Sequence, residues 1–197
     1  MNVGIYSFDQ MELLDFAGPF EVFTTASRVA ERQGLPAPFH TFTLSAQLST
    51  VQARAGLTLQ SDFLLHKHPT IDLLIIPGGV VNAELDRQEL IQWLQHQRTH
   101  CPIIASVCTG AFILAEAGLL DGLQATTHWE DLDDLRHRYP AVEVLDTPRY
   151  VDQQHTLTSA GIAAGIDLSL YLVARLTNPI LAQHTARQMD YPWTASE

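Results

Sequence analysis

Short apolar runs alternate along the chain with longer stretches in which apolar residues recur every three or four positions. The short runs are nearly continuous and rich in β-branched or aromatic residues, a pattern typical of buried strands. They cover residues 3–8, 39–44, 71–76 and 102–107. The helical spacing covers residues 19–32, 87–98, 109–117 and 162–176. Because strands and helices alternate, the pattern predicts an α/β fold with a mostly parallel central sheet and helices on both faces.

Weaker patterns fill the remaining segments. Residues 51–60 favour a small hairpin, and residues 131–139 favour a polar helix. Residues 142–145 and 150–157 are strand-like. The chain has 197 residues, of which 46% are hydrophobic, and shows no repeat or linker, so we expect a single domain over residues 1–197.

Candidate functional residues occur where predicted strands end. In a parallel sheet, ligands bind beyond the carboxyl ends of the strands. Asp15 follows the first predicted strand, Gly78-Gly79 follows the third, and Cys108 follows the fourth. We therefore expect these residues to share one edge of the sheet.

Cys108 lies at the sharpest of these positions. A buried strand leads directly into Cys108, and the small residues Gly110 and Ala111 after it let a helix start at once, which has the form of a nucleophile elbow. The N–H groups and the dipole of a helix start favour the thiolate, so we expect a reactive sulfur. The alternative is that Cys108 is a small buried hydrophobe. Cys101, at the opposite end of the same strand, is interpreted as structural.

Gly79 and Thr109 are candidates for stabilising an anion. If the Gly79 loop lies beside the elbow, the N–H groups of both residues converge on the charged atom that forms when sulfur attacks an unsaturated carbon. Asp15 lies between the first strand and its helix, where Pro19 suits the first helical turn. Asp15 is either a helix cap or, in apolar surroundings that raise its pKa, a group for proton transfer.

His128 is a further possible site residue, as the partner of Cys108 in a cysteine hydrolase. It is one of nine histidines, however, and a given histidine is more often a surface or structural residue. The other histidine pairs lack a third ligand at diagnostic spacing. The sequence therefore predicts no metal site.

Charge and composition exclude two classes of partner. The formal net charge is -11 at pH 7 and no cluster of Lys or Arg occurs, so we expect no nucleic-acid binding. The apolar stretches are too short, or too interrupted by residues such as Asp167 and Arg175, to cross a bilayer, so we expect no membrane role. Two cysteines, and no basic signal-peptide region before Val3, favour a reducing cytoplasm.

Taken together, five segments resemble the ThiJ/PfpI superfamily, which is related to class I glutamine amidotransferases. They are residues 14–23 (LDFAGPFEVF), 77–79 (PGG), 106–111 (SVCTGA), 125–129 (ATTHW) and 158–161 (TSAG). The resemblance covers nearly the whole chain and implies a flavodoxin-like three-layer sandwich with an elbow cysteine. The segments look most like the group that contains isonitrile hydratase and the amidase-like domains of some AraC-type regulators.

This resemblance implies a catalytic set of Cys108, Asp15 and Thr109. The implied reaction is hydration of an isonitrile to an N-substituted formamide through a Cys108 thioimidate, without a cofactor. The implied partners are a small-molecule substrate and a second copy of the chain in a homodimer. Residues 3–7 lack the acidic residue of several relatives, and Thr109 stands where protease-like members have His, so we expect no peptidase activity. The 197 residues show no helix-turn-helix domain like that of AraC-type regulators, so we expect no direct transcriptional control.

Two other functions remain open at this point. Hydrolysis of a small amide would use the same nucleophile and would depend more strongly on His128. A cysteine-based sensor of a ligand or an oxidant would need no turnover at all.

Overall fold

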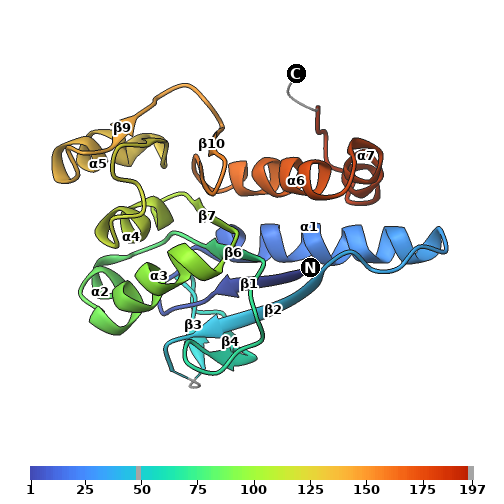
Figure 1. Ribbon diagram of the computed structural model, residues 1–197, viewed down its shortest axis with the longest axis horizontal. Coiled ribbons are helices and arrows are strands. Elements are labelled where there is room, and N and C mark those ends of the chain that lie inside the picture. Colours follow the sequence, from blue (N-terminus) through green and yellow to red (C-terminus); the bar gives the residue numbers. More distant parts are fainter. Residues whose placement is uncertain (48–49, 195–197) are drawn as a thin grey trace.

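The computed structural model describes residues 1–47 and 50–194 and has a main sheet of seven strands (Figure 1). The strands follow the order β10-β11-β7-β6-β1-β2-β5. Their bounds are β1 Asn2–Tyr6, β2 His40–Ser45, β5 Phe63–Leu64, β6 Leu73–Ile76, β7 Ile103–Val107, β10 Tyr150–Gln153 and β11 Thr156–Ser159. All neighbouring pairs are parallel except β10 and β11. The predicted mostly parallel sheet is confirmed.

Helices cover both faces of this sheet, which gives three layers (Figure 1). Helices α1 (Leu13–Arg32), α6 (Ala164–Leu176) and α7 (Pro179–Gln188) pack together on one face. Helices α2 (Asn82–Leu85), α3 (Gln88–His100) and α4 (Gly110–Glu116) pack on the other face. Crossovers between parallel strands are right-handed, so the direction of each step across the sheet decides which face its helix covers. The β1–β2 and β6–β7 connections step in opposite directions, and their helices therefore lie on opposite faces.

Short elements complete the structure. Strands β3 (Val51–Gln52) and β4 (Thr58–Leu59) form the predicted hairpin. Strand β8 (Gln124–Ala125) pairs with β9 (Glu143–Val144), and between them lie the 3-10 helix η1 (Trp129–Asp131) and helix α5 (Leu132–Arg138). Within residues 1–47 and 50–194, no helix is long and apolar enough to cross a membrane.

The central strands β6 and β7 place the candidate residues. Both strands are buried along their whole length, which is why their sequences are continuous apolar runs. They are parallel neighbours, with Ile76 opposite Ser106. Because the two strands end together, the Gly78-Gly79 loop after β6 lies beside Cys108, which follows β7.

The start of α1 differs from the prediction. The helix expected at residues 19–32 begins at Leu13, so Asp15 lies in its first turn and Pro19 lies inside it. Proline removes one helical hydrogen bond, and the stacked rings of Phe16 and Phe20 bridge the turn where this happens. Because proline usually marks the first turn of a helix or breaks it, the sequence predicted the start of α1 too late.

Other differences involve short elements. Residues 150–157 were expected as one strand-like segment but contribute to two antiparallel strands, β10 and β11, which turn at Gln154 with a φ of 71°. Elements β5, α2, β8 and η1 were not predicted because they are too short to show a period. Helix α7 was also missed, although Asn178-Pro179 is a readable start signal: the Asn178 side chain accepts the N–H of Leu181 at 2.9 Å.

Candidate active site

Cys108 lies between β7 and α4 in a backbone conformation that favours glycine. Its φ is 55°. The N–H of Cys108 donates to the carbonyl of Ser159 at 3.1 Å, and its own carbonyl accepts the hydroxyl of Thr127 at 2.8 Å. A residue with a side chain is strained at this φ, and such strain persists where neighbouring contacts hold it, commonly at functional sites. The backbone therefore has the geometry of a nucleophile elbow.

The Cys108 thiol is protonated at neutral pH. Burial and the charge of Asp15 raise the pKa of Cys108 to about 12, while the N–H groups of Thr109 and Ile162 lower it by a smaller amount. The N–H group of Thr109 at the helix start does favour the thiolate, as expected, but burial has the larger effect and raises the pKa of the thiol. A base must remove the proton before the sulfur can attack.

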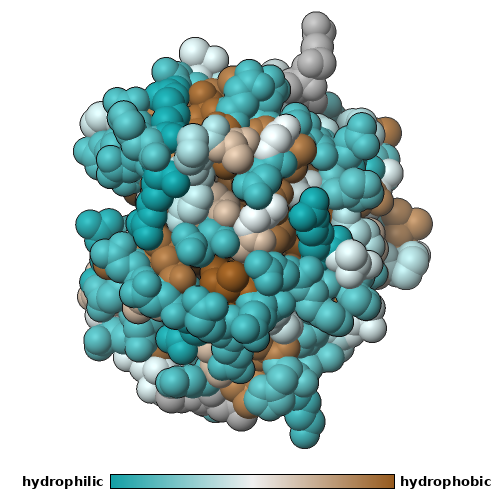
Figure 2. All heavy atoms as spheres, turned by 60° about the vertical axis from the view of Figure 1, so that its left-hand side comes forward, coloured by the Kyte–Doolittle hydropathy of each residue, from teal (hydrophilic) through white to brown (hydrophobic). Residues whose placement is uncertain are grey.

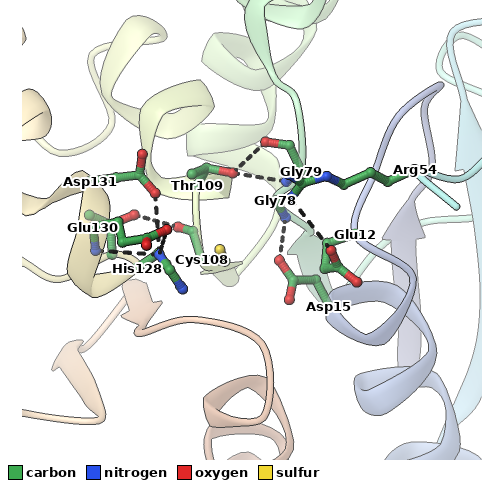
Figure 3. Close-up of polar contacts among 11 residues, drawn as sticks. Glu12, Asp15, Arg54, Gly78, Gly79, Cys108, Thr109, His128, Glu130 and Asp131 are labelled. Atoms are coloured by element: carbon green, nitrogen blue, oxygen red, sulfur yellow. Dashed lines mark hydrogen bonds and ion pairs between the residues drawn. The ribbon is translucent and has the colours of Figure 1, made fainter.

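Asp15 supplies a carboxyl group beside this thiol (Figure 3). It is fully buried, and burial raises its pKa to about 7 against a smaller, opposing effect of the Gly78 N–H. Oδ2 accepts that N–H at 3.1 Å, whereas Oδ1 has no hydrogen-bond partner among the described residues. Asp15 thus bonds to the loop after β6 instead of capping α1. At neutral pH the carboxyl group exists in both protonation states, which suits it to proton transfer.

The Gly78-Gly79 loop approaches Asp15 and Thr109 too closely for any other residue type. A Cβ atom on Gly78 would lie 2.6 Å from the backbone N of Thr109 and 2.9 Å from Oδ2 of Asp15. Gly79 has a φ of 139°, and a Cβ atom there would lie 2.4 Å from the carbonyl oxygen of Gln10. Glycine at position 78 therefore lets the end of β6 contact the elbow, and glycine at position 79 lets it contact the segment that precedes α1.

Thr109 holds this loop through its hydroxyl group. The hydroxyl accepts the N–H of Gly79 at 2.8 Å and donates to the carbonyl of Gly79 at 2.9 Å. The Gly79 N–H is thus already bonded, which differs from the expectation that it is free to stabilise an anion. The N–H of Thr109 does interact with the Cys108 sulfur, where it favours negative charge.

Ile162 provides the second N–H group for the Cys108 sulfur, a role that the sequence did not indicate. Its φ is 47°, a rare conformation for a β-branched residue. The side chain is 37% exposed and lines the pocket at Cys108. The two N–H groups that lower the pKa of the sulfur therefore come from Thr109 and Ile162. The expectation for Thr109 and Gly79 concerned the anion that forms when the sulfur attacks a substrate.

His128 and Asp15 lie on opposite sides of the Cys108 sulfur in Figure 3. Nδ1 of His128 accepts the N–H of Glu130 at 3.4 Å and lies 3.5 Å from the Asp131 carboxylate. Among the described residues, no hydrogen bond joins His128 to Cys108. The backbone N–H of Glu130 thus orients the imidazole, which lines the pocket without bonding to the thiol.

The sulfur faces a pocket of about 220 Å³. Its lining includes Cys108, Thr109, His128 and Ile162, together with the ion pair between Glu12 and Arg54, whose charged atoms are 3.8 Å apart. In the part of the chain that the structure describes, no three His, Cys, Asp or Glu side chains are grouped to hold a metal ion. The arrangement can hold a small unsaturated molecule against the Cys108 sulfur, with the buried Asp15 carboxyl group beside the thiol.

Comparison with known proteins shows the family of this chain and its fold. Residues 1–175 match the sequence profile of the DJ-1/PfpI family. This chain belongs to the DJ-1/PfpI family. The crystal structure of a ThiJ/PfpI family protein from Pseudomonas syringae, 26% identical, covers 100% of this chain and 77% of its own with a TM-score of 0.85. The superfamily and the flavodoxin-like fold expected from the sequence are confirmed.

Relatives in this DJ-1/PfpI group have more than one function. The isonitrile hydratase of Pseudomonas putida is 30% identical over 192 residues, which cover 97% of this chain and 78% of that enzyme. The HTH-type transcriptional regulator CdhR of Pseudomonas aeruginosa is 37% identical over 145 residues. This match covers 74% of the present chain but only 43% of the regulator. Family membership therefore fixes the fold and leaves the activity to be argued from the site.

Proposed function

We propose that this chain is an isonitrile hydratase-like enzyme, which adds water to an isonitrile and releases an N-substituted formamide. The observation that carries the proposal is a protonated Cys108 thiol beside the buried Asp15 carboxyl group, whose pKa is about 7. The thiol needs a base to become a nucleophile, and the carboxylate is available as that base at neutral pH. Similarity to the Pseudomonas putida isonitrile hydratase supports the same reaction.

The first half of the reaction forms a carbon–sulfur bond. The Asp15 carboxylate removes the thiol proton while the Cys108 sulfur attacks the terminal carbon of the isonitrile. Asp15 then delivers this proton to the same carbon, which gives the thioimidate R–N=CH–S–Cys. The N–H groups of Thr109 and Ile162 stabilise negative charge on the sulfur as the proton leaves.

The second half consumes one water molecule. Asp15 removes a proton from the water molecule while the water oxygen attacks the thioimidate carbon. Asp15 then passes this proton to the thioimidate nitrogen. The sulfur of Cys108 then leaves with the bonding electrons, and Asp15 transfers the remaining hydroxyl proton to it. One isonitrile and one water give one formamide, and the enzyme regains its thiol.

A turnover screen tests this proposal. The purified chain is incubated with methyl isonitrile, phenyl isonitrile and a set of small primary amides, and product formation is followed by NMR. We expect formamide from the isonitriles, no ammonia from the amides, and no product of either kind with Cys108→Ser. Ammonia release without isonitrile hydration would assign the amidase function instead.

Ligand sensing without turnover is the second candidate function, because the regulator CdhR matches 74% of this chain. In that case a small molecule would bind at the Cys108 pocket and remain unchanged. Saturable binding of an isonitrile, recovered intact after long incubation with the parent chain, would support this function over hydration.

We also propose that the chain forms a homodimer with twofold symmetry, the commonest closed arrangement, on the basis of its family resemblance. Light scattering at micromolar concentration is expected to give twice the chain mass of 21.9 kDa. A mass equal to that of one chain would contradict the dimer.

A further inference from the structure

A second cavity of about 430 Å³ adjoins the Cys108 pocket. Gly79, Val80, Thr109 and Asp131 line both spaces. Because these residues belong to both linings, the two spaces are neighbours. A molecule held at the Cys108 sulfur can therefore extend past Thr109 into the second cavity.

The lining of this second cavity is apolar on one part and polar on another. Val81, Leu85 and Phe112, which come from the loop after β6, from α2 and from α4, are buried apolar residues. The residues that α5 contributes are all polar and exposed. Figure 2 brings this side of the molecule forward and shows apolar surface in a hollow bordered by polar side chains. Buried apolar residues therefore form one wall of the second cavity, and polar residues form the other.

The size of the Cys108 pocket indicates what the second cavity holds. Sites for small molecules usually have volumes of roughly 300 to 1,000 Å³, and the Cys108 pocket has only about 220 Å³. An isonitrile is linear at carbon and nitrogen, so its substituent points away from the carbon that the sulfur attacks. A substituent that fills or exceeds the reaction pocket therefore extends beyond it, and the adjoining second cavity is the space available to it.

We propose that the second cavity binds the apolar substituent of the substrate and that Leu85 and Phe112 limit its size. This inference rests on the proposed isonitrile hydration. Apolar walls select among apolar substituents by fit, and one added or missing methylene group in such a pocket changes the specificity by roughly 10- to 200-fold. The preferred substrates are isonitriles with an aryl or a branched alkyl substituent, in preference to methyl isonitrile.

Two substitutions of Leu85 test the assignment in opposite directions. The measured quantity is kcat/KM for methyl, phenyl and 1-naphthyl isonitrile. Leu85→Phe fills the cavity, so the phenyl-to-methyl ratio is expected to fall by about tenfold or more. Leu85→Ala enlarges the cavity, so the naphthyl-to-phenyl ratio is expected to rise by a similar factor. Leu35→Phe, the same change at a residue that is 55% exposed and lines neither space, keeps both ratios.

A binding measurement separates this inference from the proposed function. N-phenylformamide is titrated against the parent and Leu85→Phe and followed by ligand-observed NMR. If no isonitrile is hydrated but N-phenylformamide binds and Leu85→Phe weakens it about tenfold, the cavity is a ligand site and the proposed function fails. The other outcome is that isonitriles are hydrated but the Leu85 variants, melting like the parent, change neither the kcat/KM ratios nor the binding of N-phenylformamide. That outcome overturns the cavity assignment. Should Leu85→Phe fail to fold, the naphthyl-to-phenyl ratio of Leu85→Ala decides.

Discussion

Strand β7 is flanked by the two cysteines of the chain, and they differ in their neighbours more than in their burial. Cys101 is 5% exposed and Cys108 is 7% exposed. Burial raises the pKa of both thiols, to about 11 for Cys101 and about 12 for Cys108. The Cys101 thiol donates to the carbonyl of Ile103 at 3.1 Å, whereas Cys108 has a positive φ, lies beside Asp15 and faces a pocket.

The difference between the two cysteines follows from the direction of the strands. At the carboxyl end of a parallel sheet, the loops that leave neighbouring strands meet and form a binding site. Cys108 therefore lies near residues that follow β1 and β6, namely Asp15 and Gly78, although all three are far apart in sequence. Cys101 precedes β7 at the opposite edge. Acidity alone does not distinguish the two cysteines, because their positions at opposite ends of β7 decide which groups surround each of them.

Replacing each sulfur by oxygen tests this comparison with the largest expected effect. Cys108→Ser is expected to lower kcat/KM for isonitrile hydration by about a thousandfold or more, because a hydroxyl group is a much weaker nucleophile than a thiol. Cys101→Ser is the matched control and is expected to keep the parent activity, since its hydroxyl group can donate to the same carbonyl of Ile103. Formamide formation followed by NMR measures both variants. Equal losses would mean that the two ends of β7 do not differ chemically.

Removing the neighbours of Cys108 should have the next largest effect. Asp15→Asn is expected to lower turnover by about a hundredfold or more, since it removes the group that transfers protons. His128→Ala should cost much less, because no hydrogen bond joins His128 to the thiol among the described residues. The reverse order would indicate a Cys–His hydrolase. Melting curves of both variants serve as the control, so that a loss of stability is not mistaken for a loss of chemistry.

The pH profile should sharpen the contrast by showing the titration of the buried Asp15 carboxyl group beside Cys108. The proposed reaction needs the Asp15 carboxylate, and burial raises the pKa of Asp15 to about 7. The rate constant kcat/KM is therefore expected to rise with pH and to level off above 7. Near pH 6 it should be about a tenth of its plateau, because the carboxylate fraction falls about tenfold per pH unit below the pKa. An inflection that persists in Asp15→Asn would assign the titrating group to another residue.

Much of the fold could be predicted because burial leaves a direct mark on the sequence. Strands buried on both faces must be apolar throughout, so β6 and β7 are visible as uninterrupted runs. The start of α1 was placed too late, because Pro19 is a strong boundary signal in a sequence but is tolerated inside a packed helix. Strands β5 and β8 have too few residues for any period.

The candidate site could be predicted only as a set of positions. Asp15, Cys108 and the Gly78-Gly79 loop could be placed together because each follows a strand of one parallel sheet. The pKa of Cys108 could not be predicted, since it depends on how tightly the neighbouring segments exclude water. The N–H group of Ile162 was also out of reach, because it comes from a distant segment and depends on a left-handed backbone conformation.

Labelling by iodoacetamide should show the smallest difference between the two cysteines. Acidity slightly favours Cys101, since the thiolate is the reactive form, whereas access favours Cys108, which lines a pocket. We expect Cys108 to react several times faster at pH 8, because the Asp15 carboxylate can take the thiol proton. Asp15→Asn should slow labelling at Cys108 alone, so Cys101 in the same sample is the internal standard for peptide mapping by mass spectrometry. Faster labelling of Cys101 would show that the elbow is closed to small molecules, and the chemical contrast between the two ends of β7 would fail.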